Sequence, residues 1–143
     1  VESFDSLPVQ RVKQAYGVCF LGDEMLIVFN GKRKVWGLVG GSLEEGESFE
    51  ECLKREVLEE SNMKIVGFRP IGFQAVTMPQ KEVIYQLRYV CLIESLGAFV
   101  ADPAGGAITE IKLIDPRLYK QYFAWGEIGD RIVQRALATK PFL

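Results

Sequence analysis

The sequence predicts one α/β domain, in which a β-sheet and at least two helices share a hydrophobic core. The 143-residue chain fits one domain and is long enough to bury most of its apolar surface. Stretches rich in β-branched and aromatic residues alternate with two segments of helical spacing, residues 49–60 and 125–137. No internal repeat, low-complexity tract or linker divides the chain. We therefore expect a single domain over residues 1–143.

The expected strands lie on both sides of the first helical segment. They are residues 14–21, 25–29, 64–78, 83–93 and 109–114. Asn30-Gly31 after the second strand is a hairpin signal, because both residues tolerate positive φ. Residues 64–78 indicate one long or bulged strand, and residues 83–93 alternate most regularly. Residues 97–107 hold a proline and two adjacent glycines and are typical of a loop.

The first helical segment is the acidic centre of the sequence. Eight of the nineteen acidic residues lie at positions 44–60, where only two basic residues accompany them. Ser48 followed three residues later by Glu51 is a capping-box pattern, so a helix should begin directly after Ser48. It should run to residue 60, with Asn62 as a left-handed residue just past its end.

Three carboxylates of this helix share one face. Glu56, Glu59 and Glu60 have i, i+3, i+4 spacing, and Leu53 and Val57 form the neighbouring apolar stripe. The carboxylates should therefore lie beside the core, where they repel one another. A hard divalent cation such as Mg²⁺ or Mn²⁺ would turn this repulsion into attraction. A solvated acidic face is the alternative, and it is the commoner fate of a charge run.

The composition excludes several kinds of catalytic residue, metal site and binding partner. The chain has no histidine, which excludes histidine bases and histidine metal ligands. Its net charge of −2 argues against a general nucleic-acid binder or a protein of anionic membranes. The three cysteines are far apart, which indicates reduced thiols in a cytoplasmic protein and no disulfide framework or zinc site. We expect neither a signal peptide nor a membrane span.

The acidic centre resembles the Nudix box, G-x5-E-x7-R-E-U-x-E-E-x-G-U, in which U is an aliphatic residue. The matching residues are Gly41, Glu47, Arg55, Glu56, Val57, Glu59, Glu60 and Met63. Asn62 stands where the family usually has glycine, and since asparagine also visits the left-handed region the turn should survive. Val39 stands where the family's lead-in from tryptophan, here Trp36, usually has proline. The resemblance implies an α/β/α sandwich built on a mixed β-sheet.

The resemblance also implies hydrolysis of a nucleoside diphosphate linked to another group, with Mg²⁺ or Mn²⁺ as cofactor. The implied metal ligands are Glu56, Glu59, Glu60 and the carbonyl oxygen of Gly40. The implied catalytic residues are Glu59 or Glu56, as the base that takes a proton from water, with Glu47 and Arg55 orienting the cluster. Nucleoside triphosphates, ADP-ribose, dinucleoside polyphosphates and capped RNA all remain open as substrates, and a homodimer is implied by resemblance alone. The alternative is a non-catalytic Nudix-like nucleotide-binding or regulatory module, which would be expected to lose some of these acids.

Candidate substrate-binding residues lie outside the motif. Arg33, between two lysines, could reach substrate phosphates, although a solvated hairpin tip is the commoner role. Four aromatic residues could stack on a base, or could instead belong to the core: Trp36, Phe73, Tyr85 and Tyr89. Some relatives use a further carboxylate, far downstream of the motif, as a metal ligand or a base. Glu110 is a better candidate for it than Glu94, because Glu110 opens a strand after a loop.

Overall fold

The structure, a computed structural model, describes residue 4, residues 6–101 and residues 106–143. Within these residues seven strands form one mixed sheet, accompanied by two α-helices and three short 3-10 helices. The strands are β1 (Val12–Leu21), β2 (Glu24–Asn30), β3 (Val35–Gly37), β4 (Val39–Ser42), β5 (Met63–Thr77), β6 (Val83–Ser95) and β7 (Ile108–Ile114). The helices are α1 (Phe49–Ser61) and α2 (Gly126–Thr139), with the 3-10 helices η1 (Val9–Arg11), η2 (Pro116–Gln121) and η3 (Lys140–Phe142).

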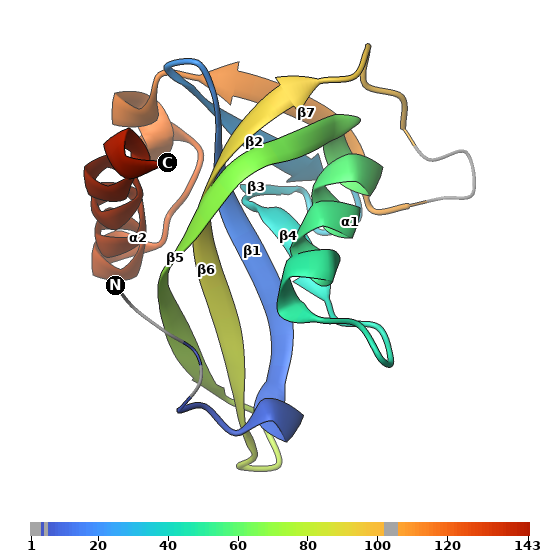
Figure 1. Cartoon of the computed structure of the whole chain (residues 1–143), viewed down its shortest axis with the longest axis vertical. Coiled ribbons are helices and arrows are strands. Elements are labelled where there is room, and N and C mark those ends of the chain that lie inside the picture. Colours follow the sequence, from blue (N-terminus) through green and yellow to red (C-terminus); the bar gives the residue numbers. More distant parts are fainter. Residues whose placement is uncertain (1–3, 5, 102–105) are drawn as a thin grey trace.

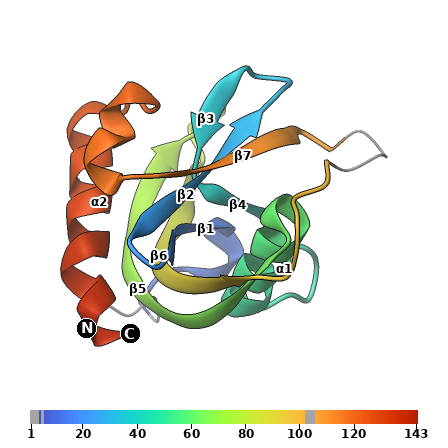
Figure 2. The same ribbon diagram turned by 90° about the horizontal axis from the view of Figure 1, so that it is seen from above.

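The two α-helices lie on opposite sides of the sheet (Figure 1), an arrangement that is also visible from above (Figure 2). One cluster of buried residues, which includes Leu53, Val57 and Leu87, joins the sheet to α1. A second cluster, which includes Phe20 and Ile132, joins the other face of the sheet to α2. Successive strand residues point to opposite faces, so each central strand supplies both clusters. The predicted α/β/α sandwich on a mixed sheet is confirmed.

Strand β1 organises the sheet around the acidic helix. It runs parallel to β6 and antiparallel to β2 and β4. Along β4, Tyr16 lies opposite Gly40 and Ala15 lies opposite Gly41, whereas the end of β1 pairs with β2. Because β4 also contacts α1, the two glycines lie between the centre of the sheet and the helix that carries the carboxylates.

The hairpin that Asn30-Gly31 indicates is present, since β2 pairs antiparallel with β3 directly after it. Neither residue has positive φ, whereas Lys34 does, at 57°. The Asn30 Oδ1 atom accepts hydrogen bonds from the backbone N–H groups of Lys32 and Arg33, each at 3.0 Å. The side chain of Asn30 therefore folds the chain into a longer turn between β2 and β3, and the basic residues lie within it.

The other predicted elements agree closely with the structure. Strand β5 is long, and its register against β6 shifts twice, as expected of a bulged strand. The loop predicted at residues 97–107 has no helix or strand in its described part, and residues 102–105 lie outside the described residues. In the described part of the chain, no helix is both long and apolar enough to cross a membrane.

Candidate active site

Helix α1 begins and ends where the sequence predicts. Ser48 and Glu51 form the complete capping box, since each side chain accepts a hydrogen bond at 3.1 Å from the other residue's backbone N–H. Asn62 follows the helix in the left-handed conformation, at φ 55°, and its side chain donates a hydrogen bond to the Ala98 carbonyl at 3.1 Å. Both ends of the helix are therefore fixed, and with them the direction of its acidic face.

Two consecutive glycines of β4 meet two glutamates that are one helical turn apart. The Gly40 N–H donates to Glu60 Oε1 at 2.8 Å. Its φ is 150°, and a Cβ atom there would come within 2.6 Å of the Tyr16 Cα atom. A Cβ atom on Gly41 would lie only 2.7 Å from Glu56 Oε1. The missing side chain at Gly40 lets β4 pack closely on β1, and the missing side chain at Gly41 lets the strand approach the Glu56 carboxylate.

Arg55 joins three carboxylates of the acidic stretch. Its Nε and Nη2 atoms donate to the two oxygens of Glu47 at 2.7 and 3.0 Å, which is a bidentate pair. Its Nη1 atom donates to Glu56 at 3.0 Å and to Glu59 at 3.2 Å. Nη2 also donates to the Ser42 carbonyl at 3.1 Å, which ties the network to β4. Arg55 thus pairs with Glu47 and also contacts two of the predicted metal ligands, Glu56 and Glu59.

The environments of these carboxylates differ. Burial raises the pKa of Glu60 to about 7, an effect that the Gly40 N–H opposes and the nearby Glu56 and Glu59 carboxylates reinforce. Burial also raises the pKa of Glu56. The hydrogen bonds from Arg55 instead lower the pKa of Glu47 to about 2. Burial thus disfavours the ionised forms of Glu56 and Glu60, whereas Arg55 favours the ionised form of the neighbouring Glu47.

The donor set has the chemistry of a site for a hard divalent cation. Three carboxylates on one helix face, beside the backbone oxygens of β4, supply the oxygen ligands that Mg²⁺ and Mn²⁺ prefer. Among the described residues, however, no three acidic, cysteine or histidine side chains stand together as a ready metal site. The reason is local: Arg55 holds Glu56 and Glu59, while Glu60 binds the backbone of β4.

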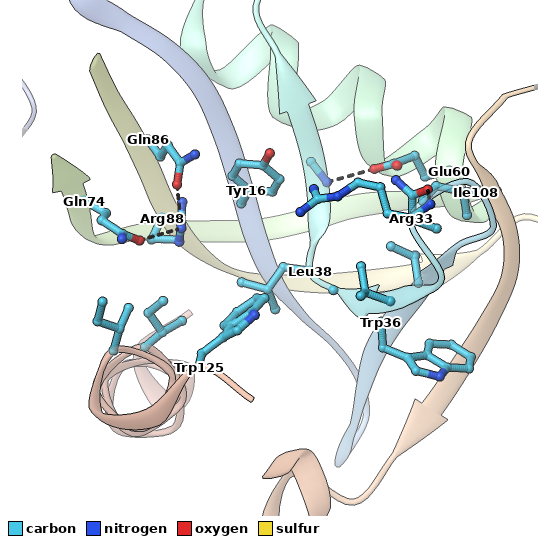
Figure 3. A pocket seen from close by; sticks show the side chains of 17 residues that line it. Tyr16, Arg33, Trp36, Leu38, Glu60, Gln74, Gln86, Arg88, Ile108 and Trp125 are labelled. Atoms are coloured by element: carbon cyan, nitrogen blue, oxygen red, sulfur yellow. Dashed lines mark hydrogen bonds between the residues drawn. The ribbon is translucent and has the colours of Figure 1, made fainter. Parts of the chain in front are cut away.

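A cavity of about 500 Å³ opens beside Glu60 on the α2 side of the sheet. Figure 3 shows its two ends: Glu60 and Arg33 lie at one, and Arg88 with Gln74 and Gln86 lies at the other. The wall between them is formed by Tyr16, Leu38, Trp125, Ile128 and Ile132, among others. The volume falls in the range of pockets that bind small ligands and cofactors.

The predicted substrate-binding residues are only partly brought together. Arg33 lines the cavity, whereas its two lysine neighbours do not. Trp36 contributes to the rim, but its ring packs edge-on against Tyr122 at 5.7 Å. Glu110 lies exposed on β7 and is not among the lining residues. Glu94 is exposed at the end of β6, where it pairs with a lysine of β5 at 3.6 Å.

The other aromatic candidates lie away from this cavity. Tyr89 is a core residue with only 3% of its surface exposed. Tyr85 and Phe73 pack edge-on against each other at 5.7 Å, and neither lines the cavity. Two aromatic residues that the sequence did not single out, Tyr16 and Trp125, line it instead.

Arg88 is the most conspicuous residue that sequence reasoning missed. It is only 8% exposed, yet it lines the cavity and stacks on the Tyr16 ring, 5.0 Å from its centroid. Its position in the sequence could have indicated this role. A charged residue in the middle of the most regular apolar strand is either paired or functional.

Comparison with known proteins places the chain among Nudix proteins. The model of the NUDIX domain matches residues 12–135. Over 89 residues, the chain is 32% identical to the NAD-capped RNA hydrolase NudC of Pasteurella multocida. That match covers 61% of this chain and 29% of the relative, so the chain spans less than a third of the relative's length.

Solved structures share the fold at low identity. The pyrophosphohydrolase BsRppH of Bacillus subtilis superposes with a TM-score of 0.73 and 22% identity, over 96% of this chain and 89% of that one. The NUDIX domain of Shewanella oneidensis NrtR, crystallised with ADP ribose, gives a TM-score of 0.71 and 16% identity, over 91% and 88% of the two chains.

Proposed function

This chain belongs to the Nudix hydrolase family, and on that basis we propose that it is a pyrophosphohydrolase acting on a nucleoside diphosphate linked to another group. One observation carries the proposal. Arg55 gathers Glu47, Glu56 and Glu59 beside Glu60, and Glu60 lines a cavity large enough for part of a nucleotide. A carboxylate cluster next to such a cavity suits a reaction that depends on charge stabilisation and positioning.

The residues divide into a reacting group and a supporting group. In the reaction, a water oxygen bonds to one phosphorus of the diphosphate bridge, the bridging P–O bond breaks, and a carboxylate takes the proton of the water. We assign this proton to Glu59 rather than Glu56, because the Glu59 side chain is 57% exposed and can reach water, whereas Glu56 is 14% exposed. Glu47 and Arg55 act as positioning residues that fix the direction of both carboxylates.

Mg²⁺ or Mn²⁺ is the cofactor that the donor set fits. Glu56, Glu59, Glu60 and the Gly40 carbonyl would hold it, and when bound it supplies positive charge against the phosphate oxygens and makes water more acidic. The Gly40 N–H keeps the Glu60 carboxylate at the cavity wall, and Arg33, which lines the same end of the cavity, would bind phosphate oxygens.

A hydrolysis panel with Mg²⁺ and with Mn²⁺, read by mass spectrometry, tests the proposal. The panel contains nucleoside triphosphates, ADP-ribose, NAD, NADH, nucleotide sugars, diadenosine polyphosphates and short RNA with an NAD cap or a 5′ triphosphate. We expect cleavage of at least one class at a diphosphate bridge, lost in Glu60→Gln and strongly reduced in Glu59→Gln. Unchanged turnover in both folded variants would refute the assigned roles.

A nucleotide-binding module without turnover is the second candidate. One observation favours it: the chain shares its fold with a NUDIX domain crystallised with ADP ribose. Calorimetry separates the candidates, since this module would bind one of the panel compounds tightly in Mg²⁺ and release no product.

A further inference from the structure

The cavity beside Glu60 continues into a second one, of about 290 Å³, between β5 and α2. The two share four lining residues: Gln74, Arg88, Ile128 and Ile132. None of the reaction steps proposed above uses this second space. Two of the shared residues, Arg88 and Gln74, lie at the end of the first cavity that is opposite Glu60 in Figure 3.

Arg88 stands at the junction as a buried cation without a counter-ion. No carboxylate of the described residues pairs with it, and its buried Nε atom has no hydrogen-bond partner there. Its Nη2 atom donates to the side-chain oxygens of Gln74 at 3.2 Å and Gln86 at 3.0 Å. Its Nη1 atom has only a long contact of 3.5 Å, with the Leu87 carbonyl.

These partners orient the guanidinium but do not neutralise it. Amide oxygens and the Tyr16 ring hold its plane, so the group is pre-organised. Burial of a charged group without an opposite charge is unfavourable, and here it lowers the pKa of Arg88. An anion at this position would supply the missing charge.

Among the described residues, the charged side chains that line the second cavity are all basic. Arg131 and Arg135 of α2 line it together with Arg88, and the part of the chain that the structure describes contributes neither aspartate nor glutamate to its lining. Arg135 is held in place by a hydrogen bond of 3.0 Å from its Nη1 atom to the Ile71 carbonyl. The guanidinium groups of Arg88 and Arg131 beside one small apolar-walled space form a site that phosphate fits well.

We propose that the junction at Arg88 and the second cavity bind a phosphate ester of the substrate that lies beyond the diphosphate bridge. This inference rests on the proposed function, because the bridge is placed at the Glu60 end and the ester at the Arg88 end. The ester is either a terminal phosphate on a ribose or the first internucleotide phosphate of an RNA. Both present the same anionic oxygens to the arginines, and they differ in whether a further nucleoside is attached to the phosphate.

The test compares compounds that differ only in this phosphate. One pair is ADP-ribose and its 2′-phosphate, and the other is NAD and a dinucleotide that carries NAD at its 5′ end. Binding is measured by calorimetry in EDTA, so that no turnover or divalent cation contributes. We expect the phosphate-bearing member of at least one pair to bind about tenfold more tightly or better, and the pair with the larger gain identifies the source of the ester.

Three variants, each of which replaces one arginine by glutamine, test which residues cause the tighter binding of the phosphate-bearing compound. Arg88→Gln should abolish the preference, and Arg131→Gln, on the exposed face of α2, should reduce it without touching the interior. Arg69→Gln is the matched control, because Arg69 is exposed on β5 and lines neither cavity. The control should bind like the wild type.

Equal binding of both members of each pair would overturn the inference, as would a preference that survives in both Arg88→Gln and Arg131→Gln. Failure of the proposed function is read separately, from the hydrolysis panel. Phosphate-dependent binding without hydrolysis of any panel compound would refute the enzyme and retain the phosphate site.

Discussion

Replacement of Gly41 by alanine tests whether the approach of β4 to α1 sets the position of the Glu56 carboxylate. The added Cβ atom would lie 2.7 Å from Glu56 Oε1 and 2.8 Å from its Cδ atom, whereas ordinary contacts begin at 3.4 Å. The carboxylate must therefore move by about 0.7 Å, away from a strand whose backbone is fixed by its pairing with β1. A displacement of about 1 Å at a reacting group can cost about 100-fold in rate, so we expect kcat to fall about 10- to 50-fold.

The assay is kcat on the panel compound that the wild type cleaves best, together with thermal unfolding. Loss of the hydrogen bond between Arg55 and Glu56 should cost less than about 2 kcal/mol, so Gly41→Ala should remain folded. Gly67→Ala is the control, because its added Cβ atom meets nothing closer than 3.9 Å. The control should keep the wild-type kcat. If folded Gly41→Ala also kept it, the glycine would not determine the position of Glu56.

Three further predictions concern the support of the acidic helix. Because Arg55 lowers the pKa of Glu47 from 4.5 to about 2, their pairing stabilises the fold fully above about pH 4.5, and this contribution is lost as the pH falls through 2. Chemical denaturation should therefore show a free energy of unfolding that falls more steeply with acidification in the wild type than in Glu47→Gln, and parallel curves would contradict the pairing. Leu53 lies on the buried face of α1 and has no exposed surface, so Leu53→Ala should lower the free energy of unfolding, measured by urea denaturation, by about 2–5 kcal/mol. A decrease below about 1 kcal/mol would contradict its place in the core. Ser48→Ala breaks the capping box with Glu51 and should lower the free energy of unfolding by about 1 kcal/mol. Ser48→Asp keeps a side-chain acceptor at this position and should retain most of the wild-type stability.

The sequence by itself determined the helix of the site and the order of its charged residues. The capping box at Ser48, the left-handed Asn62 and the common face of the carboxylates all depend on residues within a few positions of one another. Such relations follow from the geometry of one helix and hold whatever packs around it. The pairing of Arg55 with Glu47 was predictable for the same reason, since only a short loop and two helical turns separate them.

Only the tertiary structure decided what lies on the substrate side. Strand alternation puts Arg88 on the face opposite Leu87, but the neighbours on that face come from β1, β5 and α2, and their register and packing are not encoded locally. The same dependence explains why Glu110 lies away from the cavity and why the Trp36 ring packs on Tyr122, although both were candidate binding residues. The carboxylates are placed by the turn of one helix, whereas the cavity beside them is formed where a sheet face meets a second helix, and its charge depends on which distant residues meet there.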